Sequence, residues 1–244
     1  FEGRIDKGGV LHFDNVRLQE QDGVTDRGII AVGGEVDIKQ RTLKVELAAM
    51  KANPAIVTAV MKNPPEIKGE TDMLVQLSGT FDNPEATASL EIAKGSVAGV
   101  GIDKLTALLA LKDDHIQLQQ LIAAKDVYGV TASGDIPLDI FRSQEQRKNP
   151  HAQMNIVVDL DNARLGILPA MTKLVEWGVG ETKGKIRVAG TLEEPLLYGS
   201  VKIADGSVKV KHLNTVLDAI NLDVVFNGNM INLKNLSTKL GKGL

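Results

Sequence analysis

The fold is decided by a stretch of sequence that occurs twice in this chain. The first copy reads LKVELAAMKANPAIVTAVMKNPPEIKGETDMLVQLSGTFDNP (Leu43–Pro84), and the second reads MNIVVDLDNARLGILPAMTKLVEWGVGETKGKIRVAGTLEEP (Met154–Pro195). The copies align without a gap at a spacing of 111 residues (154 − 43), and apolar residues, glycine and proline fall on matching positions. A fixed period of this kind indicates stacked units, each of which covers the face of its neighbour.

The repeat extends beyond this stretch. The segment Ile116–Leu121 matches Ile231–Leu236, and Leu11–Val16 resembles an earlier copy of both. Because the chain opens on Phe1 and stops within a recurring motif, we expect it to be a piece of a longer protein. We therefore predict a single elongated domain over 1–244, with repeat units at about 23–129 and 134–244 and a partial unit at 1–22.

Most segments alternate apolar and polar residues with period two, which is typical of strands with one apolar face. Strands joined by frequent turn signals favour an extended antiparallel sheet over a βαβ fold. The prediction is a mainly β protein. Its strands include residues around Leu43–Leu47, Met73–Leu77, Ala88–Ile92, Leu105–Leu111, Ile156–Leu160 and Ile220–Phe226.

Turns and helices are predicted between these strands. Gly79–Pro84 and Gly190–Pro195 carry turn residues, with a proline expected to stop the strand ladder. Ala93–Ser96 and Ala204–Ser207 resemble hairpin turns. Two segments have apolar residues at helical spacing instead, so each unit is expected to hold one short helix and about six strands. The predicted helices span 54–62, which opens with a proline, and 165–177.

Composition excludes several classes of protein. The net charge of −3 and the aromatic content of 3% give neither the basic stripe nor the stacking platforms that nucleic-acid binding requires. The absence of cysteine excludes disulfides and thiolate metal sites. No apolar run is long enough to span a membrane, and no signal peptide is recognised.

No cluster of residues indicates catalysis, so we predict that the protein is not an enzyme and has no cofactor and no metal. The four histidines (His12, His115, His151 and His212) lack metal-ligand spacing and do not recur in register. The Asp113-Asp114-His115 run lies between two strands, where a charged tight turn is the better explanation than an acid–base cluster. Gly33-Gly34 and Gly241-Lys242-Gly243 lack the context of a phosphate-binding loop, and Asn235-Leu236-Ser237 is only a weak glycosylation signal.

What recurs is apolar alternation, and it allows two interpretations. In a closed sandwich these side chains would pack against a second sheet. In a sheet that curls around an open groove they would face a ligand, and their small average size leaves room for one. The candidate groove-lining residues are Leu43, Val45, Leu47, Met73, Val75, Leu77, Leu90, Ile92, Leu105, Leu109, Leu111, Ile116, Leu118, Ile156, Val158, Ile186, Val188, Val201, Ile203, Ile220, Leu222, Val224, Phe226, Ile231 and Leu233.

The ordered set of motifs resembles the C-terminal part of the TamB (translocation and assembly module) family, within the AsmA-like group of bridge-like lipid transfer proteins. The carrying pattern is a strand ending in Gly-Thr and a turn with proline, then alternating residues through Gly-Ser-Val and a final Ile-x-Leu-x-x-Leu. It occurs once at Leu77–Leu121 and again at Val188–Leu236. The resemblance covers most of the chain beyond about residue 43, and the two predicted helices depart from it.

This resemblance implies a long curved antiparallel sheet that forms a trough with a hydrophobic interior. It also implies a parent protein anchored in the inner membrane that crosses the periplasm of a diderm bacterium. The expected role is to carry phospholipid between the inner and outer membranes along the groove. The alternatives are a scaffold that helps outer-membrane proteins assemble with a barrel partner of the TamA type, and a structural spacer with a closed core. A β-solenoid lyase is a more distant alternative.

Overall fold

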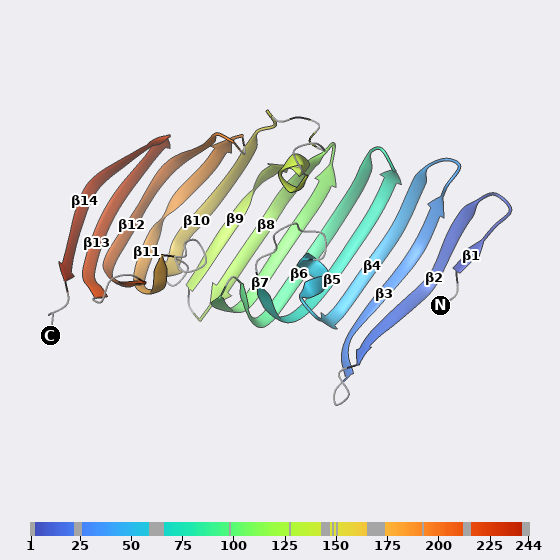
Figure 1. The fold of residues 1–244 in the computed structure, drawn as a ribbon, viewed down its shortest axis with the longest axis horizontal. Coiled ribbons are helices and arrows are strands. Elements are labelled where there is room, and N and C mark those ends of the chain that lie inside the picture. The colour runs from blue at the N-terminus through green and yellow to red at the C-terminus, as the bar shows by residue number, and fades with distance from the viewer. Residues whose placement is uncertain are drawn as a thin grey trace.

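The chain forms one open antiparallel sheet. The computed structural model describes residues 3–21, 26–58, 66–97, 99–126, 128–142, 147, 149, 151–164, 174–191, 193–211 and 216–240. Fourteen strands lie in chain order, so that each pairs with its neighbours in sequence, and β1 and β14 form the two edges. Figure 1 shows the curved sheet with the two termini at opposite ends. The prediction of a mainly β, elongated and antiparallel fold is confirmed.

The strands are long for a globular protein, mostly 10 to 16 residues. The first seven strands are β1 (Gly3–Ile5), β2 (Val10–Gln21), β3 (Asp26–Asp37), β4 (Thr42–Ala52), β5 (Ile67–Thr80), β6 (Pro84–Val97) and β7 (Val100–Lys112). The remaining seven are β8 (His115–Lys125), β9 (Tyr128–Pro137), β10 (Met154–Arg164), β11 (Val175–Gly190), β12 (Pro195–Val210), β13 (Val216–Gly228) and β14 (Met230–Leu240).

The two repeats correspond strand by strand. The six strands β3–β8 precede the six strands β9–β14, and the repeated stretch begins at β4 in the first set and at β10 in the second. Because β9 spans residues 128–137, the unit boundary predicted near 129–134 falls inside a strand. At the level of strands, the boundary lies between β8 and β9.

The strand registers place the apolar residues on one face. Directly paired residues in antiparallel strands point to the same side of the sheet. One row of such pairs crosses twelve strands, and every member is apolar or glycine. The row is Val16, Val32, Leu47, Val75, Ala88, Leu109, Leu118, Gly134, Ile156, Val188, Leu197 and Gly228.

The opposite face is polar and carries cross-strand charge pairs. Lys185 on β11 lies 3.7 Å from Asp159 on β10, and Lys202 on β12 lies 3.6 Å from Asp223 on β13. The pairs Lys104–Glu91 and Lys112–Glu85 join β7 to β6 at 2.8 and 3.5 Å. Exposed ion pairs of this kind contribute about 0–1 kcal/mol each, so they mark the solvated face more than they stabilise the sheet.

Both predicted proline turns are present, with one correction. Gly79 and Gly190 have φ values of 100° and 84°, a region that L side chains rarely adopt. Behind each glycine a threonine hydroxyl accepts a backbone hydrogen bond at 3.0 Å, from Asn83 to Thr80 and from Glu194 to Thr191. The following prolines do not stop the ladder: each is the first residue of the next strand, where its missing N–H is tolerated.

The two predicted hairpins at Ala93–Ser96 and Ala204–Ser207 are wrong. These residues lie inside β6 and β12, which continue through them. Lys94 and Asp205 have φ values of 49° and 48°, and the register against the preceding strand shifts by one residue at each place. Each is therefore a β-bulge, which inserts an extra residue and increases the local bend without reversing the chain.

The described residues contain little helix, and the structure gives a different result for each of the two predicted helices. Helix α1 (Ala55–Thr58) begins where the first was expected, but the residues after it up to 65 lie outside the described part. Most of the second predicted helix, 165–173, also lies outside it. Its last residues contradict the prediction, because Val175–Trp177 belong to β11 and pair with β12. A 3-10 turn, η1 (Leu138–Phe141), was not predicted.

Candidate functional site

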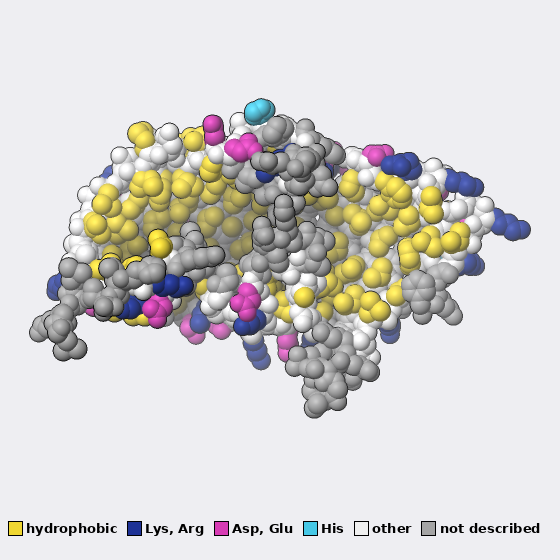
Figure 2. Space-filling view, viewed as in Figure 1, with side chains coloured by type: hydrophobic (Ala, Val, Ile, Leu, Met, Phe, Trp, Pro, Cys, Tyr) yellow, Lys and Arg dark blue, Asp and Glu magenta, His cyan; other side chains and the backbone are white. Residues whose placement is uncertain are grey.

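The candidate site is the apolar face of the sheet, which we call the groove face. Figure 2 views this face and shows hydrophobic side chains spread over it, with a hollowed middle and charged side chains gathered along its rims. The registers bring all of the candidate groove-lining residues to this one face, from Leu43 on β4 to Leu233 on β14.

Most groove-face residues are only half-buried. Val75, Leu109, Val188 and Phe226 are examples from four strands, and each keeps part of its side chain accessible. In a closed sandwich such positions would pack against a second layer and lose nearly all contact with water. The described strands form a single sheet, so no second sheet covers these residues within the described part of the chain.

The exposure increases at the β14 edge. Ile231, Leu233 and Leu236 keep 68%, 55% and 55% of their surface accessible, although the registers place them on the groove face. Contiguous exposed apolar surface of this kind is unusual in proteins that act alone in water, and it marks places where another apolar body binds. The groove face therefore stays open up to the edge of the sheet.

Two places on the groove face are deeply buried, and they repeat at the same spacing. Thr71 is fully buried between Ala52 and Ile92, its pairing partners on β4 and β6. The residues 111 positions later form the same trio: Thr182 pairs with Ala163 and Ile203. Neither threonine hydroxyl finds a hydrogen-bond partner among the described residues. A small buried cluster centred on Val208 and Ile220 packs the C-terminal part of β12 against the N-terminal part of β13.

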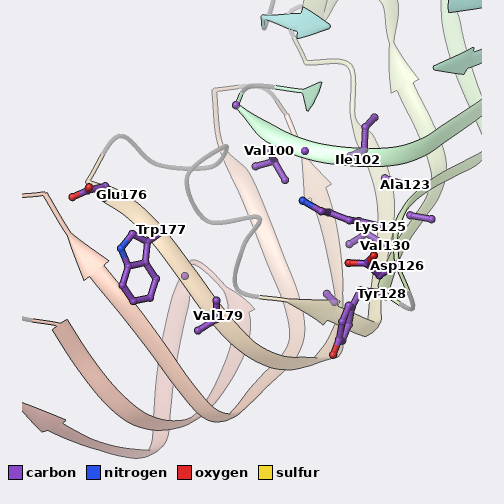
Figure 3. A pocket seen from close by; sticks show the side chains of 16 residues that line it. Val100, Ile102, Ala123, Lys125, Asp126, Tyr128, Val130, Glu176, Trp177 and Val179 are labelled. Carbon is purple, nitrogen blue, oxygen red and sulfur yellow. The ribbon is translucent and has the colours of Figure 1, made fainter. Parts of the chain in front are cut away.

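A hollow of about 410 Å³ opens where β7 and β11 approach each other across three intervening strands. Figure 3 shows its walls, with Val100 and Ile102 from β7, Lys125 from β8 and Trp177 and Val179 from β11. The strands between them are bulged: β10 breaks register beyond Asp159 with both of its neighbours. Because bulges bend strands, they bring the ends of non-adjacent strands together. We call this hollow the β7–β11 pocket.

The polar residues singled out in the sequence form structural contacts. Asp113 and Asp114 have φ values of 51° and 60° and make the tight turn between β7 and β8, as predicted. The guanidinium of Arg142 donates hydrogen bonds to Asp139 and Asp114, at 2.7 Å each, and these raise the pKa of Arg142, with Asp139 contributing most. This network ties η1 to the turn.

The three histidines in the described part of the chain all keep contact with water. His115 contacts the Asp135 carboxylate of β9, and His12 lies 3.7 Å from Asp6 and 3.8 Å from Glu35. His151 is exposed, and His212 lies outside the described residues. Among the described residues, no group of three histidines or carboxylates is arranged to hold a metal ion.

Sequence reasoning missed several groove-face residues. Val130, Ala132 and Ile136 on β9 and Leu121 on β8 belong to this face through their pairing partners. Alternation in β9 is interrupted by glycines, and small residues weaken the apolar signal, which is why this strand gave no candidates. The described residues also contain no helix long and apolar enough to cross a membrane. No protein-family model, curated protein or solved structure matches this chain.

Proposed function

We propose that this chain forms a stretch of a bridge along which phospholipids move between two membranes, with their acyl chains against the groove face. The observation that carries the proposal is the unbroken apolar row from β2 to β13, most of whose members remain partly accessible. In this view the parent protein spans the periplasm of a diderm bacterium, and no cofactor or covalent chemistry is required.

Simple energetics favour such a surface. Exposing one methylene to water costs about 0.8 kcal/mol, so moving a whole acyl chain through water costs on the order of 10 kcal/mol. A groove face that stays apolar from strand to strand removes most of this barrier. Fourteen strands at a spacing of about 4.8 Å provide roughly 60 Å of it.

The chemistry of the rims and the outer face suits the same role. A phospholipid headgroup is polar and would travel at the open side of the groove, in contact with water. The outer face carries ion pairs such as Lys185–Asp159 and stays solvated. One-sided chemistry of this kind separates the path of the acyl chain from that of the headgroup.

A second candidate is a scaffold for unfolded outer-membrane proteins, which would act with a barrel partner of the TamA type. Among the described strands β14 lies at the edge of the sheet, and a strand in that place can pair with an extended segment of another protein. The third candidate, a spacer with a closed core, receives little support from side chains that are only half-buried.

Lipid analysis of the purified, folded chain tests the first proposal. After incubation with phospholipid vesicles and removal of the vesicles, phospholipid should remain with the protein at a fixed ratio that does not change on dilution. The unfolded chain provides the control for nonspecific carry-over. Absence of retained phospholipid in the folded chain, together with binding of extended outer-membrane peptides to the β14 edge, would favour the scaffold instead.

A further inference from the structure

The β7–β11 pocket carries charges of both signs beside an apolar wall. The wall is built from Val100, Ile102, Val130 and Ala163. Lys125, Asp126 and Glu176 are also among its lining residues. An apolar hollow with charged groups on its border matches an amphiphile, which has a tail to bury and a head that stays hydrated.

Lys125 is directed into this space. Figure 3 shows its side chain extending from β8 into the gap between β7 and β11. Its ammonium lies close over Gly101 of β7, at 3.0 Å from where a Cβ on that residue would stand. Neither Lys125 nor the neighbouring Asp126 forms an ion pair with another described residue. Both charges are therefore available to a ligand.

The balance of charge selects the kind of head. Among the described lining residues, one ammonium and two carboxylates disfavour a purely anionic headgroup, and an uncharged amphiphile would gain no ionic contact from them. A head with a phosphate for Lys125 and an ammonium group for the neighbouring Asp126 would satisfy both signs. A second hollow of about 440 Å³ shares Tyr128 and Val179 with the pocket, and it adds Glu181 and Asp205 to the acidic side.

We propose that the β7–β11 pocket is a holding site for a zwitterionic phospholipid, with its phosphate at Lys125 and its ammonium group toward Asp126, which lies beside Lys125 in Figure 3. The inference rests on the proposed function, because lipid must first reach the groove face. It adds a specific binding site with a headgroup preference to a groove face that is otherwise uniformly apolar.

The single tryptophan of the chain provides the measurement. Trp177 lines the pocket and is 40% exposed, so a brominated acyl chain held there will quench its emission. The probe is phosphatidylcholine with dibrominated acyl chains, delivered from vesicles that are then removed. Unbrominated phosphatidylcholine is the matched reference, and dibrominated phosphatidylglycerol, which lacks the ammonium group, tests the head.

Two reporters separate the pocket from the groove face at large. In the double variant Trp177→Phe, Phe226→Trp, the tryptophan moves to the groove face of β13, away from the pocket. We expect loss of emission from both reporters with phosphatidylcholine. For Trp177, the loss should be much smaller with phosphatidylglycerol. Quenching at position 226 without quenching of Trp177 would overturn the pocket and leave the proposed function standing, whereas no quenching at either position would defeat both.

Substitutions supply the second line of evidence. Lys125→Gln should reduce the quenching of Trp177 by phosphatidylcholine, while Lys104→Gln, on the polar face of β7, should not. Ala123→Phe places a ring in the pocket and should abolish the quenching, with Ala110→Phe on the polar face as its control. If Lys125→Gln leaves both the quenching and the preference over phosphatidylglycerol unchanged in a folded protein, the assigned headgroup site is wrong.

Discussion

Replacing Leu109 by aspartate places a carboxylate in the middle of the groove face. Leu109 is half-buried on β7 and pairs with Ala88 on β6 and Leu118 on β8, so the new charge would stand among apolar side chains. An acyl chain that passes this point would have to strip water from the carboxylate or lift away from the surface around it, and either raises the barrier.

The size of the effect follows from the strand spacing. An extended acyl chain places about four methylenes over one strand spacing of about 4.8 Å. If the new carboxylate and its water displace those methylenes, the free energy of their burial, about 0.8 kcal/mol each, is forfeited, which amounts to about 3 kcal/mol. A barrier raised by this amount slows passage about a hundredfold.

The assay is the initial rate at which the protein moves fluorescent phospholipid from donor to acceptor vesicles. Thr106→Asp is the matched control, because Thr106 lies on the polar face of the same strand and pairs with Glu91 and Ile122. Circular dichroism and thermal unfolding establish that both variants fold. A folded Leu109→Asp protein that transfers phospholipid as fast as Thr106→Asp would refute the reasoning. If the aspartate prevents folding, Leu109→Asn provides a polar but uncharged substitute.

Four further predictions concern stability. Ile92→Ala removes a side chain that is 1% exposed and should lower the free energy of unfolding in urea by about 2–4 kcal/mol, whereas Leu108→Ala at a 38% exposed position should have a much smaller effect. Thr71→Val removes a buried hydroxyl without a partner, so it should be neutral or stabilising by about 1 kcal/mol, with no gain for Thr87→Val on the polar face. Gly95→Ala should destabilise by about 1 kcal/mol or more, because its methyl group would collide with the Lys68 carbonyl. Gly33→Ala should be tolerated better, because its methyl group would meet only the Phe13 carbonyl, at an ordinary contact distance of 3.8 Å. Hydrogen bonds from the Val10 and Gly8 N–H groups lower the pKa of Asp6 below its ordinary value, so its contribution to the β1–β2 turn is present above that ordinary value and is lost as the pH falls through the lowered pKa. The protection of the Val10 amide, measured against its intrinsic exchange rate at each pH, should therefore fall at low pH, and Asp6→Asn should show no such dependence.

Most of the strands and the sidedness of the sheet were predictable because they depend on local sequence. Alternation at period two places Val75 and Leu77 on the apolar face of their strand and Leu109 on the apolar face of its own strand, regardless of how the strands pair. Strand order followed as well, since short turns such as Gly79–Pro84 join neighbours and leave the chain no room to cross the sheet.

The bulges were not predictable from the same signals. Lys94 and Asp205 have left-handed backbone conformations, and each is followed by a glycine. This combination occurs both in tight turns and in β-bulges, so it does not distinguish between them. The choice depends on whether the neighbouring strand continues past the position, which β5 and β11 do. The unpartnered hydroxyls of Thr71 and Thr182 were equally hidden, because burial depends on what lies over a residue and not on its own identity.

The amino-acid sequence by itself determined that this protein is a repeating antiparallel sheet with one apolar and one polar face, because side-chain alternation and turn chemistry act over a few residues. Tertiary structure alone decided that the apolar face stays open and that β7 meets β11 around a charged pocket. These features arise from curvature accumulated over many strands, and each bulge and twist adds to it in a way that no short stretch of sequence records.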